Sequence, residues 1–186
     1  MLIEIVPHNP GWALGFARVK ADLRPCLPPR SQIHHIGSTA VPGLAAKDII
    51  DVQVSVPDLD RFDDTALTSA GFRRRPPTTD HCPPGMSLPK VDLQKRLYRG
   101  DTPLRANVHL RETGRFNQRY PLLCRDYLHG HPLASAAYAT IKHRLATHFP
   151  SNPDAYYDIK DPVFDLIMAA AEAWATASGW TIPPSD

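Results

Sequence analysis

The stretch that decides the fold is Ile33-His-His-Ile-Gly-Ser-Thr-Ala-Val-Pro-Gly-Leu-Ala-Ala-Lys-Asp-Ile-Ile-Asp-Val-Gln-Val54. It predicts a strand, a sharp turn at Gly37 and Ser38, a short helical segment and a second strand beside the first. Because glycine lacks a Cβ, the backbone turns sharply there and a ligand approaches closely. The free N–H groups at the start of a helical segment favour anions, so the turn predicts a phosphate-sized anion site.

The second strand, residues 49–54, carries an acid among apolar residues. Alternation along a strand places Asp51 and Gln53 on one face and the apolar side chains on the other. A carboxylate in such a strand needs a cation as partner, either a metal or Lys47. A capped turn followed by a structural strand-end aspartate fits the same pattern, so the spacing alone favours neither interpretation.

The wider sequence resembles the GrpB family, also called the UPF0157 family. The resemblance runs from about residue 4 to residue 176 and rests on the stretch 6–12, the motif 35–47, the Arg125-Asp-Tyr-Leu segment and the Tyr138-to-Lys142 spacing. The family is grouped with the nucleotidyltransferase superfamily, whose signature is Gly-Ser, a gap of about ten residues and Asp-x-Asp or Asp-x-Glu. The resemblance implies an α+β fold, a nucleotidyltransferase-like mixed sheet, mainly antiparallel, with helices packed around it, mostly on one face.

The resemblance also implies a divalent-metal site, for Mg²⁺ or Mn²⁺, built by Asp51, Gln53 and His109, with Asp51 and His109 as the catalytic candidates. Gln53 stands where the superfamily has its second carboxylate. Asp48 is an alternative acid, but it lies three residues from Asp51 and should face the other side of a regular strand. His109 is a competent metal ligand when neutral, and a hydrogen-bonded structural histidine is the alternative.

Candidates for binding nucleotide phosphates, with ATP as the expected nucleotide, are Gly37, Ser38, Lys47, Arg125 and Lys142. Arg125 is a candidate because the planar guanidinium fork suits phosphate oxygens. The family pattern places a lysine at position 142. A solvated helical lysine is the alternative for Lys142. We expect Ser38, Asp51 and His109 to converge on one cleft.

Length and composition favour one globular domain over residues 1–178, followed by a loose C-terminal tail over 179–186. A net charge of +2 gives no strong basic footprint and argues against a nucleic-acid partner. No apolar run approaches the roughly 20 residues that span a bilayer, and the start lacks a signal-peptide core. Three widely spaced cysteines predict a reduced, cytoplasmic protein.

Apolar spacing predicts helices over 10–23, 58–70, 115–128, 132–145 and 162–177, with a separate turn at 152–153. Trp12, Phe16, Val19 and Leu23 form a stripe that we assign to the core. Residues 93–99 and 106–111 predict a hairpin around 100–103. Residues 76–91 predict a long loop, which is either a lid or binding segment or a loop without a role.

Three functions remain open at this point, and the third, a nucleic-acid enzyme or binder, ranks last because the net charge is weak and an aromatic-basic patch is missing. The first is an enzyme that transfers a nucleotidyl group, most simply AMP from ATP, to an unknown small-molecule acceptor with a divalent metal. The second is a nucleotide- or phosphometabolite-binding module without catalysis. Gln53 supports the second, because a neutral amide holds divalent ions less well than a carboxylate does.

Overall fold

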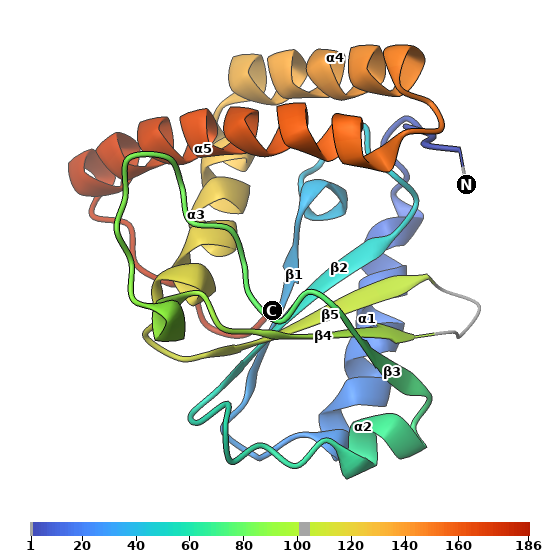
Figure 1. The fold of residues 1–186 in the computed structure, drawn as a ribbon, viewed down its shortest axis with the longest axis vertical. Coiled ribbons are helices and arrows are strands. Elements are labelled where there is room, and N and C mark those ends of the chain that lie inside the picture. Colours follow the sequence, from blue (N-terminus) through green and yellow to red (C-terminus); the bar gives the residue numbers. More distant parts are fainter. Residues whose placement is uncertain (1, 101–104) are drawn as a thin grey trace.

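The computed structural model describes residues 2–100 and 105–186, and its centre is a five-stranded mixed sheet of order β1-β2-β5-β4-β3 (Figure 1). The pair β2 and β5 is parallel and the other three pairs are antiparallel, as expected. Residues 101–103 of the predicted hairpin turn lie outside the described residues. The strands are β1 (Gln32–Ile36), β2 (Ile50–Val56), β3 (Phe72–Arg75), β4 (Arg96–Gly100) and β5 (Ala106–Glu112).

The strand register brings the polar residues of the sheet together. Asp51 of β2 lies beside Ile36 of β1 and beside Asn107 of β5. Two residues further along, Gln53 lies beside His109. Because side chains alternate along a strand, these polar residues share one face of the sheet. The prediction that residues 33–37 and 49–56 form neighbouring strands is therefore confirmed.

The apolar face of the sheet is covered by α1 (Gly11–Leu23) and α2 (Thr65–Ser69). The predicted stripe of Trp12, Phe16, Val19 and Leu23 packs in one cluster with the valines of β2, which confirms its place in the core. Each such side chain stabilises the fold by about 1.5–3 kcal/mol when fully buried. The helix predicted over 58–70 is shorter than expected. Residues 58–64 are partly buried but not helical, and only Thr65–Ser69 forms a helix.

The polar face is covered by α3 (Phe116–Gly130), α4 (Pro132–His148) and α5 (Pro153–Ser178), which share a second apolar cluster. Helices therefore lie on both faces of the sheet, and not mostly on one (Figure 1). The prediction that a helix starts at Pro162 is wrong, since α5 runs through it. A proline removes one helical hydrogen bond, but Tyr156 before it and Ile167 after it are both buried and hold the two halves in place.

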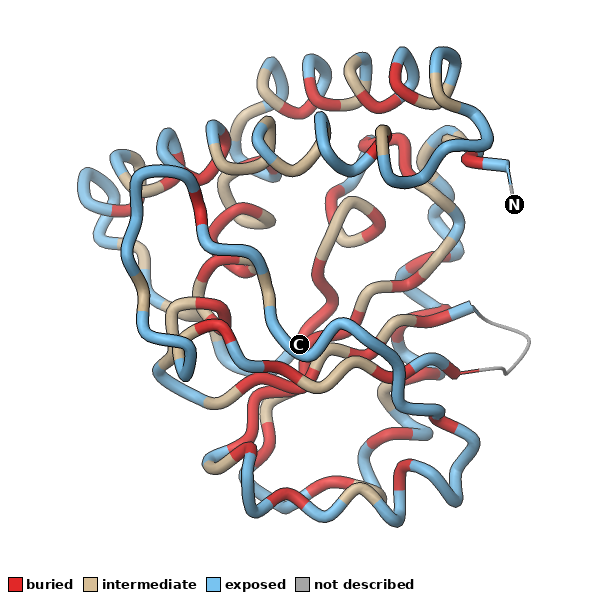
Figure 2. Tube along the Cα trace, viewed as in Figure 1, coloured by how far each residue is buried: buried red, intermediate tan, exposed pale blue. Residues whose placement is uncertain are grey.

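Three short 3₁₀ turns complete the secondary structure, namely η1 (Arg24–Cys26), η2 (Ser38–Ala40) and η3 (Lys90–Asp92). Buried residues follow the strands and recur along the helices (Figure 2). In the part of the chain that the structure describes, no helix is both long and apolar enough to cross a membrane.

The C-terminal residues are bound to the edge strand β1, so the expectation of a loose tail over 179–186 is wrong. The hydroxyl of Ser185 accepts from the backbone N–H of Ile33 at 3.0 Å and donates to its carbonyl at 2.9 Å. The carboxylate of Asp186 accepts from the backbone N–H of His35 at 2.7 Å. An edge strand has unpaired backbone groups, and the tail satisfies some of them.

The loop 76–91 leaves β3, rises to α5 and returns to β4 (Figure 1). At its stem, Thr79 forms a bridge with Gln94. Near its top, Nε2 of His81 is hydrogen bonded to Oδ1 of Asp165 of α5 at 2.8 Å. The loop is thus fastened to the sheet at one point and to α5 at another.

Candidate functional site

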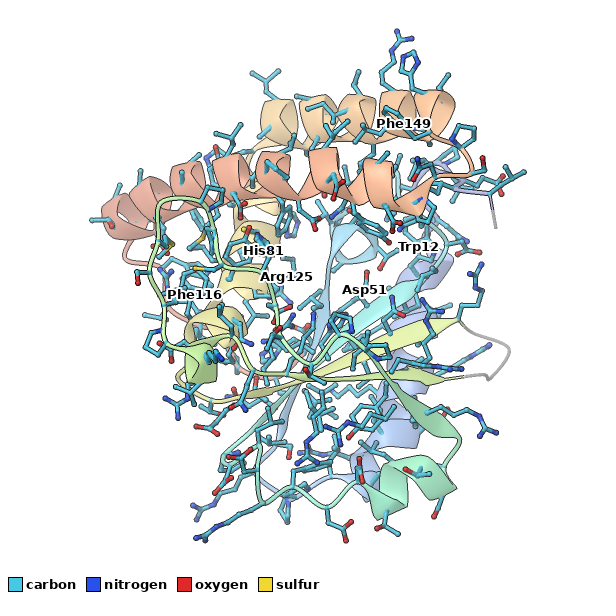
Figure 3. All side chains as sticks on the ribbon, in the orientation of Figure 1. Trp12, Asp51, His81, Phe116, Arg125 and Phe149 are labelled. Carbon is cyan, nitrogen blue, oxygen red and sulfur yellow. The ribbon has the colours of Figure 1, made fainter. Side chains whose placement is uncertain are left out.

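A cleft of about 800 Å³ lies between the polar face of the sheet and helices α3, α4 and α5. The loop 76–91 supplies part of its wall, including His81 (Figure 3). Six of the residues that the sequence singled out line this cleft, and they come from the turn, from the segment before β2, from two strands and from α4. They are Gly37, Ser38, Lys47, Asp51, His109 and Lys142.

The turn at Gly37 lies directly against the carboxylate of Asp51. Gly37 has φ +72° and ψ −169°, which is a backbone conformation that is almost confined to glycine. A Cβ at this position would lie 2.8 Å from Oδ2 of Asp51, which is closer than side-chain atoms pack. Ser38 follows and opens η2. Glycine is therefore required both by the backbone and by the approach of the acid.

Asp51 is held by neighbours from β5. The side-chain amide of Asn107 donates to Oδ1 of Asp51 at 2.9 Å, and Nε2 of His109 lies 3.7 Å from the same oxygen. Burial would raise the pKa of Asp51, but His109, Asn107 and the charge of Lys47 outweigh it and lower the pKa below its usual value. The carboxylate is therefore ionised at neutral pH.

His109 is neutral at the same pH. Burial is the largest cause that lowers its pKa, the charge of Arg111 adds to it, and the nearby Asp51 only partly offsets them. Its Nδ1 atom is buried and has no hydrogen-bond partner among residues 2–100 and 105–186. A neutral imidazole beside an ionised carboxylate can accept a proton or ligate a metal.

The donor set at Asp51 is small. Over residues 2–100 and 105–186, no three His, Cys, Asp or Glu side chains are placed to share a metal ion. Mg²⁺ is commonly held by one or two carboxylates together with water and substrate phosphates, and not by a cage of protein ligands. Asp51, with His109 beside it, fits a metal that is held mainly by the phosphates of a nucleotide.

Gln53 does not line the cleft, which corrects its predicted role as a metal ligand. The side chain is fully buried. Its amide N–H donates to the carbonyl of Gln118 at 2.8 Å, and its amide oxygen accepts from Nη1 of Arg111 at 2.8 Å. Both ends of the amide are therefore occupied in the packing between β2, β5 and α3.

Arg111 links Gln53 to the loop 76–91. Its Nε donates to Oδ2 of Asp80 at 2.9 Å, and Lys95 reaches the other carboxylate oxygen at 2.5 Å. Burial would raise the pKa of Asp80, but Arg111 and Lys95 hold it well below its usual range. This buried network fixes the stem of the loop to β5. No sequence motif indicated it, because its members are far apart along the chain.

Lys142 is buried and not solvated. Its side chain is only 2% exposed, and its Nζ donates to Oγ of Ser38 at 2.8 Å and to the carbonyl of Ala45 at 2.5 Å. Burial is the main cause that lowers the pKa of Lys142 to about 7, and the charges of Lys160 and Lys47 lower it further. The contact with Ser38 links α4 to the turn at Gly37.

Two further lysines lie at this end of the cleft. Nζ of Lys47 is hydrogen bonded to the hydroxyl of Tyr157 and lies 4.4 Å from the centre of its ring. Lys160 of α5 is paired with Asp161 at 3.1 Å. The sequence did not single out Lys160 as a site residue, although Tyr156 and Lys160 repeat the spacing of Tyr138 and Lys142.

Arg125 does not line the cleft, which corrects its predicted role with phosphate. Its guanidinium donates to the carbonyl of His35 at 2.9 Å, to Asp186 at 2.9 Å and to Asp126 at 2.7 Å. Arg125 therefore fastens the C-terminal tail and β1 to α3. Asp48 also points elsewhere, since it accepts from the indole N–H of Trp12 at 2.7 Å.

Comparison with known proteins gives matches over nearly the whole chain. Residues 2–170 match the family model described as GrpB protein. A UPF0157 protein of Pseudomonas aeruginosa is 35% identical over 177 residues, which cover 92% of this chain and 68% of that protein. A protein of Mycolicibacterium paratuberculosis that is named dephospho-CoA kinase is 30% identical over 199 residues, which cover 96% of this chain and 48% of that protein.

The same match extends to a solved structure. The crystal structure of GrpB from Enterococcus faecalis superposes with a TM-score of 0.74 at 27% identity, covering 92% of this chain and 99% of that chain. The chain spans about half the length of several curated relatives that it matches, since it covers 48% of the Mycolicibacterium protein and 48% of the UPF0157 protein YqkA of Bacillus subtilis.

Proposed function

This chain belongs to the GrpB family, and we propose that it transfers a nucleotidyl group, most simply AMP from ATP, to a small-molecule acceptor in the cytoplasm. The family match confirms the resemblance that the sequence motifs indicated. The observation that carries the proposal is the shared cleft. An anion-favouring turn, an ionised carboxylate and four lysines, namely Lys47, Lys95, Lys142 and Lys160, line one space of about 800 Å³.

The proposed roles follow from the contacts. The hydroxyl of Ser38 and the backbone N–H groups at the start of η2 would bind phosphate oxygens, and Lys47 and Lys142 would offset their charge. Asp51 would hold Mg²⁺ or Mn²⁺, with His109 beside it as a further ligand or as a proton acceptor for the acceptor hydroxyl or amine. The metal, when bound, would supply Lewis-acid stabilisation of the phosphate charge. In-line transfer requires mainly positioning and charge, so this short set of residues is sufficient in principle.

The second candidate is a nucleotide- or phosphometabolite-binding module without catalysis. The specific observation in its favour is the state of Gln53. The superfamily's second carboxylate is absent at this position, and the side chain that replaces it is buried against Arg111 and Gln118. Such a module keeps the turn and the lysines but holds a divalent cation less firmly.

The test of the proposal is pyrophosphate release from ATP, GTP, CTP and UTP, each with Mg²⁺ or Mn²⁺, against a pool of candidate acceptors. Asp51→Asn keeps the size of the side chain and removes its charge, so we expect turnover to be lost while the fold survives. Asp60→Asn is the matched control, because Asp60 is exposed and lies outside the cleft.

The outcomes separate the two candidates. Release by the parent chain and by Asp60→Asn, but not by Asp51→Asn, supports the enzyme. An Asp51→Asn chain as active as the parent sinks the catalytic role of Asp51. If the parent releases no pyrophosphate with any acceptor but is stabilised by ATP, the binding module is favoured, since a ligand at 100 times its Kd stabilises the native state by about 2.7 kcal/mol.

A further inference from the structure

The amino group of Lys142 is buried, and no described residue gives it an acidic partner. Its two hydrogen-bond acceptors, the hydroxyl of Ser38 and the carbonyl of Ala45, are both neutral. Across the parts of the chain that the structure describes, no carboxylate forms an ion pair with Lys142. Burying a charge without a counter-charge is among the most costly arrangements in a protein, and a titratable group responds by losing the charge.

The charged groups that face Lys142 make the cost larger. Lys160 comes from α5 and Lys47 from the segment that precedes β2, and both carry positive charge. Asp161 is already paired with Lys160 at 3.1 Å. On α4 itself, the ring of Tyr138 lies 4.6 Å from Nζ of Lys142, and burial raises the pKa of Tyr138, so that the ring stays neutral. The cleft without an anion therefore disfavours a proton on Lys142.

We infer that the cleft takes up an inorganic or nucleotide polyphosphate together with one proton, and that this proton goes to Nζ of Lys142. The inference rests on the proposed function, because it concerns the same cleft. A bound polyphosphate supplies the missing negative charge among Lys47, Lys142 and Lys160. Protonation converts the lone pair of Nζ into a third N–H, which donates to a phosphate oxygen while Ser38 and Ala45 keep the other two. The solvent or its buffer supplies the proton.

The inference predicts how binding depends on pH. The pKa of Lys142 is about 7 in the free chain, so Lys142 is mostly neutral at pH 8 and mostly charged at pH 6. A site that takes up one proton loses affinity as the pH rises above that value. Between pH 7.5 and pH 8.5 we expect the Kd for a polyphosphate to rise about eightfold.

The experiment measures proton uptake directly. Inorganic tripolyphosphate is titrated into the chain at pH 8 without metal, by calorimetry in several buffers that differ in ionisation enthalpy. The dependence of the heat on the buffer gives the number of protons bound. Lys142→Arg is the matched variant, because arginine keeps the charge and does not titrate in this range. Subtracting it removes the protonation of the ligand itself.

We expect the parent chain to take up about 0.9 more protons per site than Lys142→Arg at pH 8, and about half a proton more at pH 7. Equal uptake by the two chains overturns the inference and leaves the proposed anion cleft standing. A parent chain that does not bind tripolyphosphate between pH 6 and pH 8 overturns both the inference and the proposed anion cleft.

A second measurement does not depend on a variant that folds. The ¹³Cε resonance of Lys142 in the labelled parent chain reports its charge. We expect it to titrate with a midpoint near 7 in the free chain and to move to higher pH when tripolyphosphate is added. A midpoint above about 9 in the free chain contradicts the inference, because the group would then already carry its proton.

Discussion

Replacing Gly37 by alanine tests whether the turn and the acid of the cleft depend on each other. Alanine at φ +72° and ψ −169° is strained, and this region costs a residue other than glycine about 1–3 kcal/mol. The new Cβ would also lie 2.8 Å from Oδ2 and 3.2 Å from Cβ of Asp51. The Asp51 side chain therefore has to move away from the turn, and its hydrogen bond from Asn107 is strained in turn.

Gly71→Ala is the matched control. Gly71 also has a positive φ, +90°, but no atom of the described residues lies within 4 Å of a Cβ built there. It therefore carries the backbone strain without the contact. For a domain of this length, 1 kcal/mol corresponds to about 2–4 °C in Tm, so strain alone lowers Tm by about 2–12 °C. We expect the unfolding free energy of Gly37→Ala to be lower than that of Gly71→Ala by about 1 kcal/mol, because only Gly37→Ala has the close contact with Asp51.

The assays are urea unfolding of the two variants and nucleotide-dependent pyrophosphate release or ATP binding. We expect Gly71→Ala to keep the pyrophosphate release or ATP binding of the parent chain and Gly37→Ala to lose it. A Gly37→Ala chain that is no less stable than Gly71→Ala and keeps its nucleotide response would refute the reasoning, since the turn could then accept a side chain without displacing Asp51.

Three other predictions concern the surroundings of the cleft. The pKa of Lys142 is lowered to about 7 in the folded chain, so between pH 8 and pH 9.5 the unfolded chain binds more protons and stability rises by about 1.4 kcal/mol per pH unit. Lys142→Met should remove this slope in urea unfolding, and two parallel pH profiles would contradict the assignment. Gln53→Asp should destabilise the chain by about 1–3 kcal/mol and should not raise turnover, because the shorter side chain loses the buried hydrogen bond to the carbonyl of Gln118. Higher pyrophosphate release would show that position 53 does reach the metal. Asp165→Ala should expose the loop 76–91 to limited proteolysis by removing the acceptor of His81, and cleavage at the rate of the parent would show that the loop is held by its stem alone.

The fold was accessible from the sequence where local pattern and tertiary packing agree. The alternation in β2 places its valines in the same apolar cluster as the helical stripe of α1, so the place of both in the core followed from spacing. The pattern failed where distant contacts decide. Pro162 predicts a helix start, yet packing on both sides keeps α5 continuous. The tail has no apolar period, yet polar contacts with β1 order it.

The site divides in the same way. The spacing predicts that Gly37 and Asp51 meet, because Gly37 follows the end of β1 and Asp51 lies at the start of the antiparallel neighbour β2. Arg125 and Gln53 were misassigned because long polar side chains reach several partners, and the partners that bind them come from elsewhere in the chain. The burial of Lys142 depends on α5 and the turn closing over it, so its sequence neighbours carry no sign of it.

The parallel pairing of β2 with β5 affects how a pair of catalytic acids can be recognised in a sequence. A motif search for catalytic acids examines one strand and tests whether a second acid lies two residues after the first acid. In this sheet the nearest polar neighbour of Asp51 stands across the ladder, at Asn107, and already touches its carboxylate at 2.9 Å. Exchanging one amide nitrogen for oxygen there would produce adjacent carboxylates without any change at Gln53. Lineages of this fold can thus gain or lose an acidic pair through a position that a linear motif never inspects.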